Sequence, residues 1–227
     1  MEEKIYSVAV DGPSGAGKST LAKAVAAELG IVYVDTGAIY RSIGYEIFRR
    51  GMDPKDAAAV TAVLSEIHIE MRYGEDGLQQ MYLNGDDVTT EIRRPEISMY
   101  ASGVSAIGEV RAFLLNMQRD LAKKSSVIMD GRDIGTVVLP DADVKIYLTA
   151  SVETRAKRRM LELEQRGTPQ PFEEVLQQIE ERDWADMHRD VAPLRQAEDA
   201  VVVDTSALNF EESLAEILKV IRKGREQ

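Results

Sequence analysis

Residues 12–20 read Gly12-Pro13-Ser14-Gly15-Ala16-Gly17-Lys18-Ser19-Thr20, and they directly follow the apolar run of residues 5–10. The spacing G-x-x-x-x-G-K-[ST], after a strand and before a helix, is typical of a loop that binds nucleotide phosphates. Its glycines let consecutive backbone N–H groups turn inward around phosphate oxygens. We therefore predict that this loop binds a nucleoside triphosphate.

Two side chains of the loop have distinct predicted tasks. Lys18, which we expect to be an exposed loop lysine, adds a positive charge for the β- and γ-phosphates. The hydroxyl of Ser19 is placed to ligate Mg²⁺. A helix is predicted next, because apolar residues recur every four positions over 21–29 and Gly30 follows as a C-terminal cap. The positive dipole end of this helix then faces the same anion.

The bulk composition excludes several classes of protein. A chain of 227 residues with 44% hydrophobic content is typical of a globular protein with a sizeable core. There are no cysteines, which excludes disulfides and thiolate metal sites. The net charge of −11 argues against a nucleic-acid or anionic-membrane partner. Residues 1–4 do not open a basic leader and no run of 18 apolar residues occurs, so we expect a cytoplasmic protein, and we expect a monomer.

The order of the apolar segments predicts the fold class. Short β-branched runs alternate with helical stretches, at residues 5–10, 31–34, 127–129, 144–148 and 201–203. This alternation predicts an α/β fold, a three-layer sandwich around a mostly parallel central sheet. Ligands bind such sheets at the carboxyl ends of the strands. Gly12, Asp35 and Asp130 each stand at such an end.

One region interrupts the alternation. Asp53-Pro54 predicts a capped helix that runs to about Ile67. A small antiparallel meander follows, with the turn Asn84-Gly85, and then two helices near 96–107 and 109–123. We therefore predict an inserted region at 54–124 and a core made of 1–53 and 125–227.

The last third of the chain predicts long charged helices, at 152–165, 173–189 and 211–223. Within the first, Arg155-Ala156-Lys157-Arg158-Arg159 gathers four cations without an acid. Composition alone leaves two readings open, a solvated helix face or an anion site. Gly167 and Pro169 are loop-forming residues at which a hinged segment could end. We predict a short helical lid at about 152–170, whose cations gain partners only when phosphates arrive.

Two further segments place charge at the sheet edge. Asp130 follows the strand at 127–129 as the carboxylate of a Walker B strand does, and it would serve Mg²⁺ directly or through water. Arg132 and Asp133 follow at once. Arg41 lies about one turn into the helix after the strand at 31–34. Taken singly, Arg41 could be a surface residue and Asp133 a cap.

Together these motifs resemble a known family. They are DGPSGAGKST at 11–20, DTGAIYR at 35–41, NGDDVTTEIR at 84–93, DGRDIGTVVLPDA at 130–142, KIYLTAS at 145–151, RAKRR at 155–159 and RDVAPL at 189–194. The chain resembles the bacterial cytidylate kinases, nucleoside-monophosphate kinases of the P-loop superfamily, nearly from end to end. The resemblance implies transfer of the γ-phosphoryl group of ATP to CMP or dCMP with Mg²⁺. It also implies that the inserted region binds the nucleoside monophosphate.

The resemblance also implies residue roles. Around the acceptor phosphate it places Arg41, Arg132 and Arg189. Around the cytosine it places Ser102, Arg111 and Asp133. Near the ribose it places Asp186, and Thr36, where some members have serine, contacts the pyrimidine or the ribose. In the lid over ATP it places Arg155 and Arg159, and in the helix that returns from the lid it places Arg182. The predicted catalytic residues are Lys18, Arg132, Arg155, Arg159 and Arg182.

Other functions predict other features. A P-loop switch GTPase would carry an Asn-Lys-x-Asp motif that reads guanine, and the chain has none. A kinase for another small acceptor, such as uridylate, adenylate or dephospho-coenzyme A, would have the same phosphate loop. His68 and His188 are the only histidines, and they lack the spacing of metal ligands, so we expect structural or surface roles for them.

Overall fold

The computed structural model describes residues 5–75, 77–165 and 167–225. The prediction drawn from residues 1–4 therefore falls outside the described part of the chain. The chain forms two compact units. The first holds the residues up to Tyr33 and those from Ala122 onward, and the second holds Val34–Leu121.

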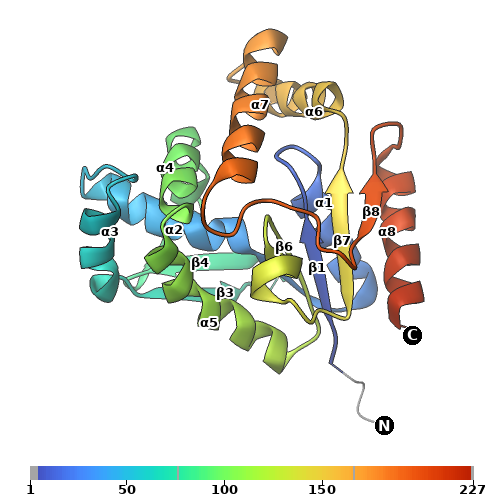
Figure 1. The fold of residues 1–227 in the computed structure, drawn as a ribbon, viewed down its shortest axis with the longest axis horizontal. Helices are drawn as coiled ribbons and strands as arrows, with labels where there is room; N and C mark the ends of the chain where they lie inside the picture. Colours follow the sequence, from blue (N-terminus) through green and yellow to red (C-terminus); the bar gives the residue numbers. More distant parts are fainter. Residues whose placement is uncertain (1–4, 76, 166, 226–227) are drawn as a thin grey trace. The chain divides into compact units, whose positions relative to one another are not determined.

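The first unit is built on a five-stranded sheet of order β2-β6-β1-β7-β8 (Figure 1). The strands are β1 (Ser7–Asp11), β2 (Val32–Asp35), β6 (Val127–Gly131), β7 (Val144–Thr149) and β8 (Val201–Asp204). β1 pairs in parallel with β6 and β7, and β7 pairs in parallel with β8. All five predicted strands are present, and the α/β class with a largely parallel sheet is confirmed. β2 spans the boundary between the two units, because the first unit ends at Tyr33 and the second begins at Val34.

Helices α1 (Lys18–Leu29) and α8 (Phe210–Arg225) cover one face of this sheet. Val25 of α1 and Ile221 of α8 are fully buried in one cluster with residues of β1, β7 and β8. Gly30 ends α1 at φ 65°, and its N–H donates to the carbonyl of Ala26, so the predicted cap is confirmed. The aliphatic residues of β1, β6 and β7 are buried, whereas Val201 and Val202 of β8 are about half exposed.

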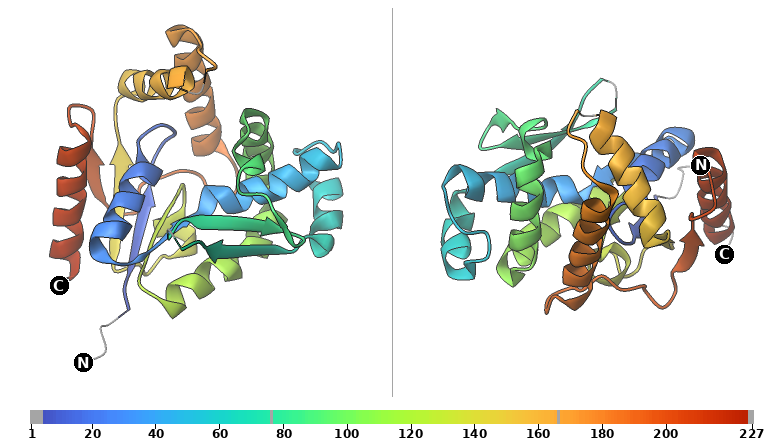
Figure 2. Two further views of the ribbon diagram at one scale, coloured as in Figure 1. Left: turned by 180° about the vertical axis from the view of Figure 1, so that it is seen from behind. Right: turned by 90° about the horizontal axis from the view of Figure 1, so that it is seen from above.

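Two helices extend from the carboxyl end of β7. α6 (Val152–Gln165) and α7 (Phe172–His188) pack against each other through a separate small cluster, and Figure 2 shows them adjacent in both views. The cluster comprises Ala156, Leu163, Val175 and Ile179. The boundaries of α6 match the predicted helix, and those of α7 and α8 lie within two residues of the predicted ones.

The second unit holds the smaller sheet. β3 (Ile69–Tyr73), β4 (Gln79–Leu83) and β5 (Asp86–Asp87) pair antiparallel, which confirms the predicted meander. Its remaining elements are α2 (Thr36–Arg49), α3 (Ala57–Val63), the 3-10 turns η1 (Leu64–Glu66) and η2 (Glu91–Arg93), α4 (Pro95–Ser105) and α5 (Gly108–Lys124), whose last residues pass into the first unit. α2 and α4 cross closely, because a Cβ at Gly44 would lie 2.7 Å from the backbone nitrogen of Ala101.

The predicted start of the helix after Asp53-Pro54 is wrong. The side chain of Asp53 accepts from the N–H of Lys55 at 2.9 Å and forms a local turn. Asp56 is the cap, since its carboxylate accepts from the N–H of Ala59 at 3.0 Å and α3 begins at Ala57. A local side-chain bond at Asp53 therefore delays the helix by one turn.

The compact units differ from the predicted division at residue 54. α2 belongs to the second unit, because it packs against α4. That residues 54–124 bind the nucleoside monophosphate stays a prediction.

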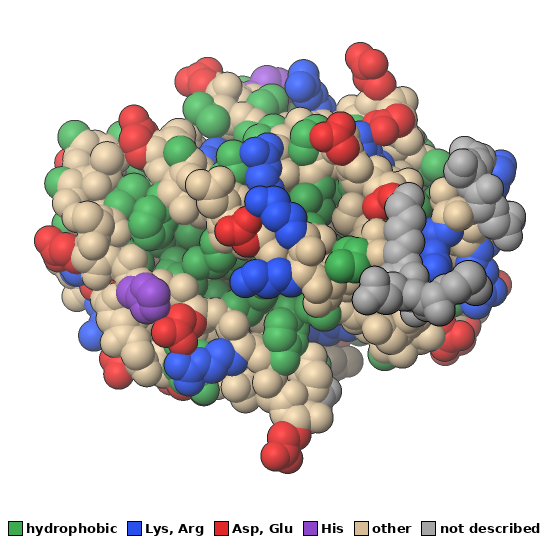
Figure 3. Space-filling view, turned by 90° about the horizontal axis from the view of Figure 1, so that it is seen from below, with side chains coloured by type: hydrophobic (Ala, Val, Ile, Leu, Met, Phe, Trp, Pro, Cys, Tyr) green, Lys and Arg blue, Asp and Glu red, His purple; other side chains and the backbone are tan. Residues whose placement is uncertain are grey.

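The described part of the chain contains no helix that is both long and apolar enough to cross a bilayer. On the face that Figure 3 shows, Lys and Arg side chains are interspersed with Asp, Glu and hydrophobic side chains.

Candidate functional site

The phosphate loop connects β1 to α1 and requires its glycines. Gly12, Gly15 and Gly17 have φ values of 151°, 73° and 88°. A Cβ at Gly12 would lie only 1.9 Å from the carbonyl oxygen of Leu148 in β7. Pro13 and Ala16 are buried, whereas Thr20 is exposed. The predicted tight turn is therefore enforced both by backbone conformation and by the adjacent strand.

Lys18 is buried, so the expectation of an exposed lysine is wrong. Its side chain bends back over the loop, where Nζ donates to the carbonyls of Gly12 at 2.8 Å and Pro13 at 2.7 Å. Burial, reinforced by the positive charge of Arg132, holds the pKa of Lys18 well below its usual range. The ammonium group is thus already positioned by the loop it belongs to.

Asp130 ends β6 beside the start of α1. One carboxylate oxygen accepts from the hydroxyl of Ser19 and the other from the hydroxyl of Tyr33, both at 2.8 Å. The structure brings together the two predicted Mg²⁺ ligands, and Tyr33 is a partner that the sequence did not suggest. Hydroxyl and carboxylate oxygens are the donors Mg²⁺ prefers, and it usually keeps waters and substrate phosphates as its other ligands. The donor set therefore fits this ion, even though the described residues contain no cluster of three or more His, Asp or Glu side chains that could hold a metal.

Asp11, the last residue of β1, has a place that sequence reasoning missed. Its carboxylate accepts from the N–H groups of Ile134 at 2.8 Å and Gly135 at 2.7 Å. Burial raises its pKa to about 6, although these two hydrogen bonds oppose the shift. The bonds fix the start of the π-helical turn η3 (Ile134–Val138), directly after Arg132 and Asp133. Asp11 thereby positions the segment that carries both predicted side chains.

Four of the predicted acceptor-site residues form two ion pairs. Nε of Arg132 donates to Asp186 at 2.7 Å, and Arg189 lies 3.6 Å from the carboxylate of Asp133. Burial alone would raise the pKa of Asp186, but the positive charges of Arg132 and Arg182 lower it below its usual value. Arg132 and Asp133 lie between β6 and η3, whereas Asp186 and Arg189 lie at the end of α7 and directly after it. Tertiary packing therefore unites segments that lie far apart in the sequence.

The arginines of the predicted lid already have partners in the structure. The expectation that they gain partners only when phosphates arrive is therefore wrong. Arg155 is buried and forms an ion pair with Asp183 of α7. Its guanidinium also donates to the carbonyls of Ser14 and Ala150, each at 2.9 Å. Sequence reasoning missed Asp183, because its position 28 residues away gives no spacing signal.

The neighbouring arginines are also engaged. Arg158 donates to the hydroxyl of Thr205 at 3.1 Å and to its carbonyl at 2.8 Å. Arg159 pairs with Glu162 within α6 at 3.0 Å and is one-third exposed. The charge of Arg182 acts on Lys18. The predicted role of the segment as a moving lid stays a prediction.

Within the second unit, Asp35 organises two arginines. Its carboxylate caps α2 by accepting from the N–H of Ala38 at 2.9 Å. It also lies 3.7 Å from Arg41 and 3.8 Å from Arg93. Thr36 beside it is buried. Arg93 is a cation that sequence reasoning did not single out.

Two more predicted residues meet in the same unit. The guanidinium of Arg111 donates to the carbonyl of Ser105 at 3.0 Å and lies 5.2 Å from the centre of the Tyr40 ring. The hydroxyl of Ser105 donates to the carbonyl of Ser102 at 2.9 Å. Ser102 and Arg111 thus belong to one local network between α4 and α5, whereas their predicted contacts with cytosine remain predictions.

A family model described as "Cytidylate kinase" matches residues 8–223. The cytidylate kinase of Caldicellulosiruptor bescii is 49% identical over 220 residues, which cover 97% of both chains. The cytidylate kinase of Lactobacillus johnsonii is 45% identical and covers 96% of this chain and 95% of its own.

Solved structures share the fold at low sequence identity. A gluconokinase from Sinorhizobium meliloti aligns at a TM-score of 0.50 with 16% identity, covering 97% of this chain and 94% of its own. An uncharacterized protein from Eubacterium ventriosum aligns at 0.54 with 13% identity, covering 96% and 98%. These likenesses support the α/β fold alone.

Proposed function

We propose that this chain, because it belongs to the cytidylate kinase family, transfers the γ-phosphoryl group of ATP to CMP or dCMP. The near full-length identity of 49% to a cytidylate kinase carries the proposal. The phosphate loop supports ATP as the donor, since its turn and its lysine are those of a nucleotide-phosphate site.

The reaction joins two anions, and the chain offers cations to offset their repulsion. Phosphoryl transfer requires in-line positioning and stabilisation of the charge on the moving group. Lys18, Arg132, Arg182 and the lid arginines Arg155 and Arg159 would supply positive charge. No general base is assigned, because the acceptor phosphate is already an oxyanion. Mg²⁺, held by Ser19 and Asp130, would neutralise charge on the phosphates of ATP.

Specificity for cytosine would rest on Asp133. A carboxylate accepts a hydrogen bond from the exocyclic amine of cytosine, whereas uracil presents a carbonyl oxygen at that position and is repelled. Asp133 is buried beside Arg189. A mismatched base would leave buried polar groups unpaired, which is costly.

An ADP-release assay with ATP and Mg²⁺ tests the proposal against CMP, dCMP, UMP, AMP, GMP and dephospho-coenzyme A. We expect kcat/KM for CMP and dCMP to exceed that for UMP by at least roughly tenfold. Asp133→Ala should erode this ratio, whereas Asp141→Ala, which removes an exposed carboxylate from the loop before β7, should not. Equal use of CMP and UMP by the unsubstituted protein would overturn the assignment.

We further propose that the protein is a cytoplasmic monomer. Its acidic composition and the absence of cysteines are compatible with that setting. Light scattering at several protein concentrations tests the first part, and cell fractionation tests the second. A stable dimer or a membrane-bound pool would contradict them.

A further inference from the structure

The carboxylate of Asp183 contacts the phosphate loop. Asp183 belongs to α7 and is only 7% exposed. One of its oxygens accepts from the backbone N–H of Ser14 at 3.0 Å, and the other pairs with Arg155. Ser14 is inside the loop whose N–H groups are the donors for phosphate oxygens. The carboxylate of Asp183 therefore binds the N–H of Ser14 and the guanidinium of Arg155, two groups that would also bind a phosphate group.

Asp183, Arg155 and Ser14 each contact the other two. Besides pairing with Asp183, Arg155 donates to the carbonyl of Ser14 at 2.9 Å, so the loop residue is held by both partners. The loop and α6 touch directly, since a Cβ at Gly15 would lie 3.2 Å from Cβ of Arg155. Carboxylate and phosphate oxygens accept the same charge-assisted hydrogen bonds from N–H and guanidinium groups.

We propose that Asp183 occupies, in the nucleotide-free protein, a position that a phosphate group of ATP takes on binding, and that it is a positioning residue that sets the affinity for ATP. The inference rests on the proposed function only in requiring that the loop bind ATP. Two anions at Ser14 and Arg155 repel each other, so the nucleotide displaces Asp183. When the nucleotide leaves, Asp183 pairs with the same groups again.

Thermodynamic linkage predicts the direction of the effect. If Asp183 makes these contacts only in the nucleotide-free state, removing its charge destabilises that state alone and ATP binds more tightly. A carboxylate that merely ties α7 to the loop in both states has no such effect, and its loss leaves ATP binding unchanged or weakens it. The sign of the change in affinity thus separates the two roles.

Asp183→Asn is the decisive variant. The amide oxygen can still accept from Ser14, but the charge is lost and an amide N–H group faces Arg155. We expect calorimetry to show roughly threefold to tenfold tighter binding of ATP, together with a lower Tm of the nucleotide-free protein. Glu180→Gln removes an exposed carboxylate from the same helix and should change the affinity by less than about twofold. Unchanged or weaker ATP binding by Asp183→Asn would overturn the proposal.

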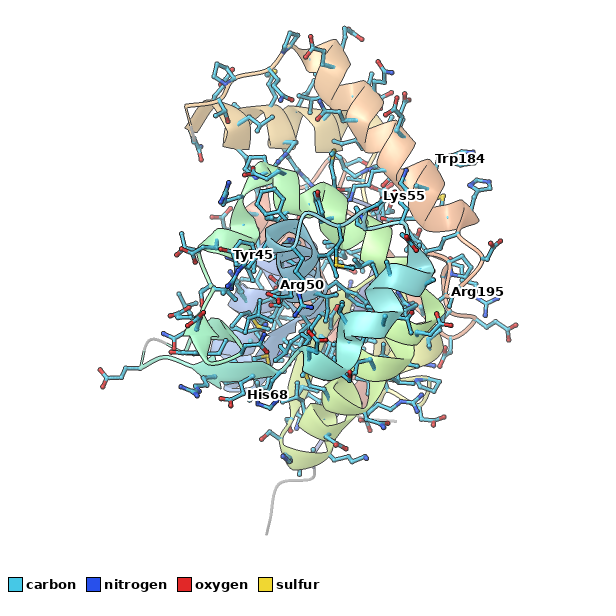
Figure 4. All side chains as sticks on the ribbon, turned by 90° about the vertical axis from the view of Figure 1, so that its left-hand side faces the viewer. Tyr45, Arg50, Lys55, His68, Trp184 and Arg195 are labelled. Carbon is cyan, nitrogen blue, oxygen red and sulfur yellow. The ribbon has the colours of Figure 1, made fainter. Side chains whose placement is uncertain are left out.

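The unsubstituted protein offers a second measurement, which serves if the variant does not fold. Trp184, the only tryptophan of the chain, follows Asp183, and its ring stacks on His188 with 4.5 Å between ring centres. It points away from α7 and is 65% exposed (Figure 4). Saturating ATP should change its fluorescence, whereas adenosine, which carries no phosphate, should not.

The same sample separates the two possible failures. If the protein binds ATP and releases ADP with CMP, but saturating ATP leaves the Trp184 emission unchanged, the role of Asp183 is wrong and the proposed function stands. If it neither binds ATP nor releases ADP, the proposed function fails and this inference fails with it.

Discussion

Replacing Gly12 by alanine should cost far more stability than replacing Gly30 by alanine. Both glycines have positive φ, at 151° and 65°, so both variants place an L side chain in a disfavoured conformation. This strain costs about 1–2 kcal/mol at each position. The two sites differ in space, because a Cβ at Gly30 meets nothing within 4 Å, whereas one at Gly12 lies 1.9 Å from the backbone oxygen of Leu148.

The clash at Gly12 has no cheap relief. The obstructing atom belongs to β7, which pairs with β1 and β8, so the loop or a central strand must shift. Overpacking of this kind adds about 1–3 kcal/mol. We therefore expect a loss of roughly 2–5 kcal/mol for Gly12→Ala and of about 1–2 kcal/mol for Gly30→Ala.

Urea denaturation at equilibrium measures both values by linear extrapolation. Circular dichroism of the folded variants is the control for a change of fold. If the two variants lose stability equally, to within about 0.5 kcal/mol, then the contact with Leu148 does not matter and the reasoning from this geometry is refuted.

Three further changes test the site. Lys18→Ala should lower kcat by about two orders of magnitude, or roughly 3 kcal/mol of barrier; turnover above a third of the original, measured by ADP release, would contradict the phosphate-loop assignment. Burial raises the pKa of Asp11 from 3.8 to about 6, so the folded state binds the extra proton in that window. The free energy of unfolding should then fall by about 3 kcal/mol as pH rises from below 3.8 to well above 6. Denaturation of Asp11→Asn should lack this component, and identical pH profiles would disprove it. Arg159→Ala should lower kcat strongly while changing Tm little. Hydrogen exchange over residues 152–170 should slow most when an ATP analogue and CMP are both bound. Exchange that is the same in all states would indicate a static helix.

The elements that depend on local sequence were predictable. The glycines at 12, 15 and 17 lie where the turn requires positive φ, and Gly30 ends α1 where the apolar repeat stops. The five apolar runs correspond to the five strands of the large sheet, because strands covered by helices need only short continuous hydrophobic segments. The one misplaced helix start, at Asp53-Pro54, failed because two nearby aspartates compete for local N–H groups.

The sequence by itself determined the phosphate loop, the α/β order and the antiparallel meander, since backbone preference and hydrophobic spacing act between near neighbours. Only the tertiary structure decided which charges meet. In the folded chain, Lys18 is buried and donates to the carbonyl of Gly12 in its own loop. Asp11 accepts from the N–H of Ile134, and Asp183 contacts both Ser14 and Arg155. Asp11 and Asp183 meet their partners across long stretches of chain, and no periodicity records such pairs. They form because polar groups buried by the fold must find hydrogen-bond partners wherever packing has placed them.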